Sequence, residues 1–425
     1  MAMFEGFKSL PFEHKTLPFE QKNIPFEHKT MPFEHLGRFF YGETDHHKGY
    51  GGGVGCRRRD RALIIIWELP SSSAPVHIFH YICIALEHSL RLRLTTKRLM
   101  ATETTATIMI MLLCCLVLAA LDAFVCGLLS LAGWVTFKKA FLWGLWSLVL
   151  PPLLIAYGAF IGRNRFEVNE VELTFKDLPE AFDGYRIVHI SDIHARSFVG
   201  REERLAEAAA LINALEPDLI AFTGDLITLS PEELITLTEP LSSLTAKDGV
   251  VSILGNHDYS MYSDASEQQK QEHLKTLIAK ESELGWNLLL NENMTIRRGA
   301  DSIAVIGVEN TSPSHFFPSK GNLPKASEGT ERMFRILLSH DPMHWEAEIT
   351  GKDYPLTLSG HTHAMQMSIL GWCPSSLMFK QYRGLYTKGG QHLYVNIGLG
   401  ETLFPARIGA RPEITLIQIS RLRSK

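Results

Sequence analysis

Residues 186–194 read RIVHISDIH, a short apolar run that leads directly into an aspartate and, two residues later, a histidine. Such a run predicts a buried strand, with Asp192 and His194 in the loop just beyond its carboxyl end. In open α/β sheets the loops at these ends converge and carry the functional groups. The stretch therefore predicts one strand of a layered sheet and two polar residues at its functional edge.

Four further apolar runs have the same form. They cover residues 218–222, 250–254, 335–339 and 355–359, and they lead into Asp225, into Asn256, His257 and Asp258, into His340, and into His361 and His363. Helical periods separate the early runs, notably at residues 203–215 and 231–244. Strand and helix alternating at this spacing predict a layered α/β fold with much parallel sheet. Residues 166–175 alternate in the manner of a half-exposed strand.

The residues that follow the five runs are of the types that bind metal ions. A single aspartate or histidine after a strand is usually a cap or a solvated residue, but five strand ends together predict one site. The candidate ligands are Asp192, His194, Asp225, Asn256, His340, His361 and His363. Carboxylate and imidazole ligands without thiolate suit manganese, iron or zinc. Seven ligands exceed the needs of one tetrahedral zinc but fit two ions, about 3.5–4 Å apart, that share a carboxylate.

Other motifs narrow the chemistry. Glycine precedes the key residue in three motifs, at Gly224, Gly255 and Gly360, where it lets the backbone approach an ion closely. No C-x-x-C pair is present, which argues against a thiolate zinc site. The absence of a G-x-x-x-x-G-K-[ST] signature argues against hydrolysis of nucleoside triphosphates by a P-loop.

Residues 1–99 are predicted to be disordered or of low complexity. Four repeats of an apolar residue followed by Pro-Phe-Glu recur at a spacing of seven between residues 10 and 34. Proline in every repeat excludes a coiled coil, because each ring removes a backbone donor and clashes with the preceding turn. An open alternative is that this stretch is upstream sequence read through by a gene model, with Met100 as the true start.

Residues 100–165 are predicted to be a membrane anchor with two transmembrane helices. Residues 108–135 contain one charge, Asp122, and residues 140–162 contain none. A hydrocarbon core requires about 20 apolar residues in a helix, so both runs are long enough to span it. A cleaved signal peptide is the alternative for residues 108–135. This run is too long for the apolar core of a signal peptide, however, and a second apolar run follows at once. Buried helices of a soluble domain are the other alternative.

The orientation of the anchor stays open. Lys and Arg are usually more frequent on the cytoplasmic side of a transmembrane helix. Two basic residues flank the second run on each side, so this rule does not orient it. If residues 91–98 are translated, their four basic residues favour a cytoplasmic start and a cytoplasmic catalytic domain.

The order D-x-H, G-D, G-N-H-D, an isolated H and G-H-T-H resembles that of the calcineurin-like metallophosphoesterase family. The resemblance runs from about residue 185 to the end of the chain. It implies a metallo-dependent phosphatase-like α/β fold over residues 166–425, a two-sheet β-sandwich flanked by helices. By the family pattern the first metal would be held by Asp192, His194 and His363, and the second by Asn256, His340 and His361, with Asp225 bridging. His257 would lie beside the scissile phosphate as proton donor or transition-state stabiliser.

The apolar start and the ending at residues 398–413 resemble one branch of this family, the membrane-associated bacterial phosphoesterases. Some members of that branch cleave the pyrophosphate of UDP-2,3-diacylglucosamine. The resemblance implies a hydrolase that cleaves a phosphoester or phosphoanhydride with a two-metal-activated hydroxide. It also implies a location at the bacterial inner membrane and offers a lipid-linked phosphate as substrate.

Some residues depart from the family pattern or carry two interpretations. Thr228 stands where many relatives have a second aspartate, so we expect altered support of the ligands rather than loss of metal. Arg196 and Arg407 are candidates for binding substrate phosphate, although an isolated arginine is more often a surface charge. Asp258 is expected to orient a neighbouring side chain. His189 lies inside a predicted strand and is expected in the core.

Composition sets the remaining limits. A formal net charge of −4 gives no reason to expect nucleic acid as a partner. Only Cys373 lies within residues 166–425, so an internal disulfide is excluded there. Two alternatives to an enzyme are a non-catalytic metal-binding scaffold and a membrane sensor that retains the fold. A scaffold should have lost ligands, and all seven are present, which favours the enzyme.

Overall fold

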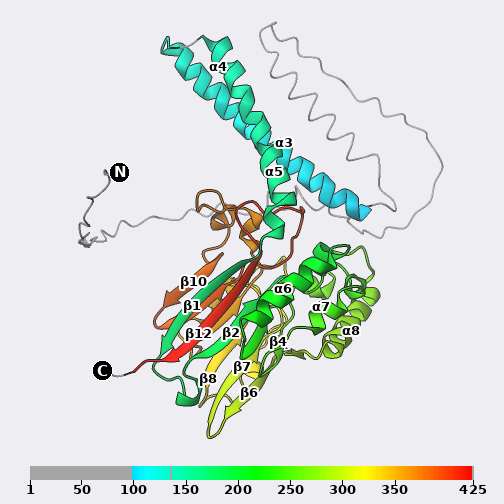
Figure 1. Cartoon of the computed structure of the whole chain (residues 1–425), viewed down its shortest axis with the longest axis vertical. Coiled ribbons are helices and arrows are strands. Elements are labelled where there is room, and N and C mark those ends of the chain that lie inside the picture. Colours follow the sequence, from blue (N-terminus) through cyan, green and yellow to red (C-terminus); the bar gives the residue numbers. More distant parts are fainter. Residues whose placement is uncertain (1–97, 135, 424–425) are drawn as a thin grey trace, which may run out of the picture. The chain divides into compact units, whose positions relative to one another are not determined.

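The computed structural model describes residues 98–134 and 136–423 (Figure 1). The described residues all belong to one compact unit. The prediction for residues 1–99 therefore falls outside the described part, except for the two residues that begin the first helix.

Helices and strands alternate in the central part of the chain. The helices are α3 (Arg98–Leu131), α4 (Phe137–Gly144), α5 (Leu150–Phe160), α6 (Glu202–Ala214), α7 (Thr238–Ser242), α8 (Glu267–Glu283) and α9 (Leu323–Ala326). The strands are β1 (Glu167–Phe175), β2 (Tyr185–Ile190), β3 (Leu219–Phe222), β4 (Val250–Ser252), β5 (Asn287–Leu288), β6 (Glu292–Arg298), β7 (Asp301–Gly307), β8 (Phe334–Leu338), β9 (Leu356–Ser359), β10 (Gly384–Lys388), β11 (Gln391–Val395) and β12 (Glu413–Arg421). Single helical turns are η1 (Leu145–Val149), η2 (Gly162–Asn164), η3 (Glu180–Phe182), η4 (Ala195–Phe198), η5 (Pro231–Leu234), η6 (His257–Tyr259), η7 (Trp345–Ile349), η8 (His363–Gln366) and η9 (Pro374–Leu377).

Two mixed sheets of six strands each form the domain, which confirms the predicted two-sheet α/β fold. The first has the order β1-β12-β2-β3-β4-β5, and the second has the order β10-β11-β9-β8-β7-β6. The last strand, β12, lies between β1 and β2, parallel to the former and antiparallel to the latter (Figure 1). All five apolar runs that precede candidate ligands are strands, namely β2, β3, β4, β8 and β9.

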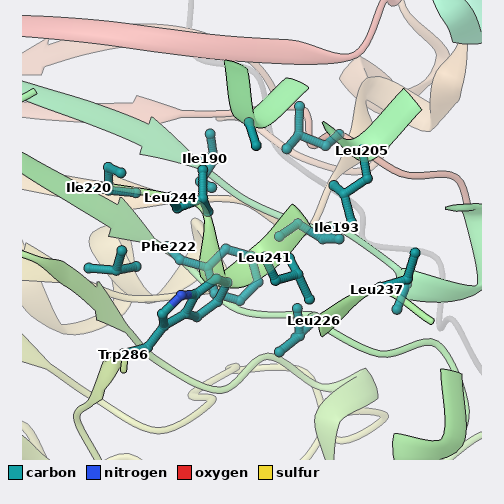
Figure 2. Close-up of a cluster of buried hydrophobic side chains, with 14 of the residues drawn as sticks. Ile190, Ile193, Leu205, Ile220, Phe222, Leu226, Leu237, Leu241, Leu244 and Trp286 are labelled. Carbon is teal, nitrogen blue, oxygen red and sulfur yellow. The ribbon is translucent and has the colours of Figure 1, made fainter. Parts of the chain in front are cut away.

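The sheets pack against each other through a shared apolar core. Inward side chains of the first sheet, such as Ile187 and Ile417, lie in one buried cluster with Ile336 and Leu358 of the second. Alternating residues of the first sheet point the other way, toward the helices. There Ile220 and Phe222 of β3 lie with Leu205, Leu241 and Trp286 in a second cluster (Figure 2). Both faces of β3 are therefore buried, as its continuous apolar run requires.

The helix predictions have mixed outcomes. The period at residues 203–215 is confirmed as α6, one residue earlier at each end. The period at residues 231–244 is divided instead into the single turn η5 and the short helix α7. An apolar period fixes which side chains face the core, but it does not require one continuous helix. Leu234 at the end of η5 and Leu237 between the two pieces are both still buried.

The predicted anchor residues are helical, but their two halves differ. Thr107–Leu131 of α3 is 25 residues long with a mean hydropathy of 2.8, and among the described residues it alone is long and apolar enough to cross a membrane. Residues of the second predicted span are divided between α4, η1 and α5. Pro151 lies in the first turn of α5, where no helical backbone donor is needed. The second transmembrane helix therefore stays a prediction.

The end of α5 is in close contact with the loop at residues 404–409. Gly158 accepts a hydrogen bond at its carbonyl from the backbone N–H of Arg407, at 3.2 Å. A Cβ added to Gly158 would lie 2.8 Å from Ile408 Cγ1, and one added to Gly162 would lie 1.9 Å from the Arg407 carbonyl oxygen. The two glycines, one helical turn apart, therefore allow the helix to touch the backbone of the catalytic domain.

We expect Gly162→Ala to destabilise the protein, because its methyl group would overlap a backbone oxygen that cannot move alone. The expected loss is about 1–3 kcal/mol of unfolding free energy, seen as a lower Tm of the detergent-purified chain. Gly127→Ala in α3 is the matched control, since nothing lies within 4 Å of its added Cβ. Equal melting temperatures for the two variants would contradict the close contact.

Candidate metal centre

The carboxyl ends of five strands meet at one place and bring most of the predicted ligands together. Ligand atoms lie within 4.8 Å of one another in three groups. These groups are Asp192, His194 and His363; His194, Asp225 and His257; and Asp225, His340 and His361. Asp225 belongs to two of the groups, so it joins the residues that follow β2 and β4 to those that follow β8 and β9.

In the first group, imidazole and carboxylate atoms converge without satisfying one another. The Nε2 atoms of His194 and His363 lie 3.0 Å apart. Asp192 Oδ1 lies 3.2 Å from His363 Nε2 and 3.9 Å from His194 Nε2. This buried oxygen has no hydrogen-bond partner, which is rare for a buried carboxylate. Three inward-facing ligand atoms with an unsatisfied oxygen fit a divalent cation.

Another set of candidate ligands, Asn256, His340 and His361, is arranged around the side-chain amide of Asn256. Asn256 Oδ1 lies 2.8 Å from His361 Nδ1 and 3.2 Å from His340 Nε2. The amide nitrogen of Asn256 donates to the hydroxyl of Tyr262 at 3.1 Å, which turns the oxygen toward the two imidazoles. His340 Nδ1 faces the carbonyl of Thr223 at 2.7 Å, so its Nε2 is directed at the site. Sequence reasoning missed Tyr262, which no motif marks.

Backbone conformation at the site is unusual for the residue types. Five predicted ligands have positive φ angles: Asp192 (49°), His194 (43°), Asp225 (59°), His361 (74°) and His363 (49°). Residues other than glycine rarely adopt this left-handed conformation, and where they do the surrounding structure must hold them there. The glycines contribute close approach: a Cβ on Gly255 would lie 2.2 Å from Asp225 Oδ1, and one on Gly360 would lie 2.3 Å from Asp192 Oδ2.

Asp258 binds the backbone of the two loops that follow β3 and β4. Its buried carboxylate accepts hydrogen bonds from the backbone N–H groups of Asp225, Leu226, Ile227 and Gly255, at 2.8–3.2 Å. The sequence analysis expected Asp258 to orient a neighbouring side chain. It orients backbone instead, and through it the loops that carry Asp225 and Asn256.

Burial and charge set the protonation of the histidines. Burial holds the pKa of His194 well below its usual range and also lowers the pKa of His257 and of His361. These rings are therefore neutral near pH 7, with a lone pair available to a cation. His340 differs: burial opposes its charged form, but Asp225 Oδ2 at 3.2 Å raises the pKa of His340 to about 10. A cation bound there would release that proton.

His257 is half-buried and lies beside the candidate ligands His194 and Asp225. Its Nδ1 donates to the carbonyl of Thr228 at 2.9 Å, which leaves Nε2 unprotonated in the neutral ring. Its backbone N–H donates to Asp225 Oδ1 at 2.8 Å. The ring packs edge-on against His194, with centroids 4.6 Å apart. The side chain is thus fixed in orientation beside the candidate ligands.

Three residues that the sequence analysis singled out lie around the site. The hydroxyl of Thr228 lies 3.4 Å from His194 Nδ1, so threonine still contacts a ligand where many relatives have aspartate. Arg196, half-buried, follows His194 within η4, and its backbone N–H donates to Glu233. Arg407 is fully buried and donates to the carbonyls of Ile397, Gly400 and Ala410. Its Nη2 also lies 3.3 Å from His363 Nδ1, behind the candidate ligand.

Aromatic rings line one side of the site. The rings of Phe317 and Phe379 meet the His361 ring edge-on, with centroids 4.8 and 5.8 Å away. The Tyr262 ring lies 4.3 Å from that of His257. Apolar surface next to convergent polar groups is the usual composition of a small-molecule site.

Comparison with known proteins agrees with this geometry. The calcineurin-like phosphoesterase family model matches residues 185–365. The uncharacterized metallophosphoesterase YkuE of Bacillus subtilis is 31% identical over 299 residues, which cover 66% of this chain and 97% of that protein. A transmembrane protein with metallophosphoesterase domain from Danio rerio is 31% identical over 287 residues, 65% of this chain and 62% of that protein. The UDP-2,3-diacylglucosamine pyrophosphatase LpxG of Chlamydia muridarum is 27% identical over 317 residues, 60% of this chain and 90% of that protein.

The family match and the relatives identify a phosphoester hydrolase of a class that uses divalent metal ions, and the residue groups at the strand ends are its candidate metal ligands. The chain belongs to the calcineurin-like metallophosphoesterase family.

We expect Asp258→Ala to lower the free energy of unfolding by about 3 kcal/mol, because it strands four buried backbone donors. Urea unfolding of the full chain in detergent with a chelator present measures this without any contribution from bound metal. Asp264→Ala, at an exposed aspartate six residues away, is the control and should leave the midpoint unchanged. If both variants unfold at the same midpoint, Asp258 does not hold the loops together.

Proposed function

We propose that residues 166–425 hydrolyse a phosphoester or phosphoanhydride bond at a centre of two divalent cations. One observation carries this proposal: Asp225 Oδ2 lies 3.7 Å from His194 Nε2 and 3.2 Å from His340 Nε2, between two separate sets of ligands. A carboxylate shared in this way is the usual feature of sites that hold two metal ions.

The ligand sets follow from these contacts. Asp192, His194 and His363 would hold one cation, and Asn256, His340 and His361 the other, with Asp225 shared. Manganese, iron or zinc would suit the mixed oxygen and nitrogen donors. When bound, such cations would supply Lewis-acid activation of the phosphate and of the attacking water.

The protein contributes orientation and proton transfer. Burial lowers the pKa of His257, so its ring is neutral in the free site, whereas the negative charge of a bound phosphate would favour the protonated form. Since Nδ1 donates to Thr228, the proton for the leaving oxygen would be carried on Nε2. The neighbouring arginines have different surroundings. Arg196 lies two residues after the candidate ligand His194 and could contact a phosphate. The hydrogen bonds of Arg407 to backbone carbonyls make a substrate contact by that residue harder to achieve.

We further propose that residues 100–165 anchor the enzyme in a membrane, the bacterial inner membrane, through α3 and the helices after it. The hydropathy of Thr107–Leu131 supports this, as do the exposed apolar side chains of α5. A membrane location makes a lipid-linked phosphate a fitting substrate. The name of the relative LpxG, a pyrophosphatase of a diacylated sugar nucleotide, gives that class further support.

Two variants separate metal binding from proton transfer. Asp225→Ala should weaken both ions and reduce activity to background, while the wild type binds close to two equivalents of Mn²⁺. His257→Ala should keep its metal but lower kcat by roughly 10²–10⁴-fold, the usual contribution of a positioned proton donor. This deficit should shrink for an acidic leaving group such as nitrophenolate, which needs little protonation.

Metal analysis of all three proteins, with rates measured across leaving groups of graded pKa, decides the assignment. A wild-type protein that binds one ion or none after reconstitution with Mn²⁺ would rule out the dinuclear centre. Loss of metal from the His257 variant, or an equal deficit for every leaving group, would rule out its role as proton donor.

The anchor makes a separate prediction. The full chain should remain in the membrane pellet after extraction with alkaline carbonate, because apolar spans are not released by high pH. Reporters placed before α3 and after β12 should lie on the same side of the membrane if there are two spans, and on opposite sides if there is one. Release into the soluble fraction would contradict the anchor altogether.

A further inference from the structure

The segment that follows the last two candidate ligands is apolar, uncharged and exposed. Residues 364–379 contain no aspartate, glutamate, lysine or arginine. The exposed fraction of the side chain is 104% for Leu370, 79% for Leu377 and 51% for Trp372, and Ile369 and Met378 are also exposed. A contiguous group of large apolar side chains without charge is unusual on a soluble surface and marks a site of contact with a partner.

The tip of this segment is a strained turn that presents leucine to the outside. Ile369 and Trp372 exchange backbone hydrogen bonds of 2.9 and 3.0 Å across a two-residue turn. Both turn residues have positive φ, 51° at Leu370 and 84° at Gly371. Such turns favour Asn, Asp or Gly at the first of these positions, where a leucine is both strained and fully solvated. A cost of this kind at an exposed tip points to a function for the leucine side chain.

The base of the segment is fixed against the loop that holds α5. The backbone N–H of Ser368 donates to the Ile408 carbonyl at 2.7 Å, and a Cβ added to Gly409 would lie 2.0 Å from the Ser368 carbonyl oxygen. Ile408 is the residue that Gly158 of α5 approaches on its other side. One short loop therefore joins the apolar segment to the helix that leads out of the proposed membrane anchor.

Both ends of residues 364–379 lie next to the candidate metal centre. It begins directly after His363, and it ends at Phe379, whose ring lies 5.8 Å from that of His361. Only a short stretch of chain therefore separates the exposed tip at Leu370 from the candidate active site.

We propose that residues 364–379 form an interfacial membrane-contacting element, which inserts Leu370, Trp372 and Leu377 into the surface of the bilayer that holds the anchor. The proposal deepens the proposed function and rests on it in assuming that α3 to α5 lie in a membrane. A bilayer fits better than a protein partner because the segment carries no charge and packs on the same short loop as the apolar helix α5. Tryptophan beside aliphatic residues is also the composition that membrane interfaces favour. Insertion of this element orients the candidate metal centre toward phosphate groups at the lipid surface.

Photocrosslinking of the full chain tests the contact directly. The chain carrying Leu370→p-benzoylphenylalanine is reconstituted in vesicles of phosphatidylethanolamine and phosphatidylglycerol and irradiated. Lipid adducts are expected at this position. They should be absent for the control Ile235→p-benzoylphenylalanine, at a residue 70% exposed that lies between η5 and α7. Adducts to a second copy of the chain only, or a lipid yield no higher than at Ile235, would overturn the proposal.

A kinetic comparison tests the consequence. The variant carrying Leu370→Asp and Leu377→Asp should lose about tenfold in kcat/KM on CDP-diacylglycerol in the same vesicles, since two apolar contacts with lipid are removed. Its rate on soluble bis(p-nitrophenyl) phosphate should stay unchanged, which also shows that it has folded. Equal losses on both substrates would contradict the membrane contact. If the wild type hydrolysed neither substrate, the proposed function would fail, and the crosslinking result would still decide the membrane contact.

Discussion

The buried carboxylate of Asp258 binds backbone N–H groups from the loops that follow both β3 and β4, and the geometry of the site depends on this contact. Asp225 can adopt its left-handed conformation because its own N–H and the next two are bound to Asp258. The same carboxylate binds the N–H of Gly255, whose missing side chain makes room for Asp225 Oδ1. One ionisable group thus brings together two loops that are 30 residues apart and fixes the carboxylate shared by both sets of ligands.

Around this contact, each ligand is oriented by a group that does not itself face the site. Thr223 fixes His340, Tyr262 fixes Asn256, and Thr228 lies against His194. These three partners are one backbone carbonyl and two hydroxyls, and none of them is charged. The negative charge next to the candidate ligands lies on Asp192 and Asp225, where bound cations would balance it, while burial keeps His194, His257 and His361 neutral. Among the candidate ligands with left-handed backbone, Asp225 and His194 are held by such contacts, from Asp258 and Thr228 respectively.

A chain of contacts also leads from the metal centre to the proposed anchor. His363 touches the guanidinium of Arg407, and the backbone of Arg407 touches Gly158 and Gly162 at the end of α5. The loop that contains Arg407 also supports the apolar segment at residues 364–379. The end of α5, the apolar segment and the candidate ligand His363 are therefore linked through contacts with one short loop.

The sequence by itself determined the parts of this protein in which a short apolar run is followed at once by its ligands. Strand and candidate ligand are neighbours in the chain, so local pattern was enough to predict β2, β3, β4, β8 and β9 and most of the residues that form three groups with ligand atoms within 4.8 Å. Only the tertiary structure decided the position of β12 between β1 and β2, the division of residues 231–244 into two pieces, and the contacts of Asp258, Tyr262 and Gly162. Those features depend on groups distant in the chain, or on backbone angles such as that of Leu370, and neither leaves a periodic signal in the sequence.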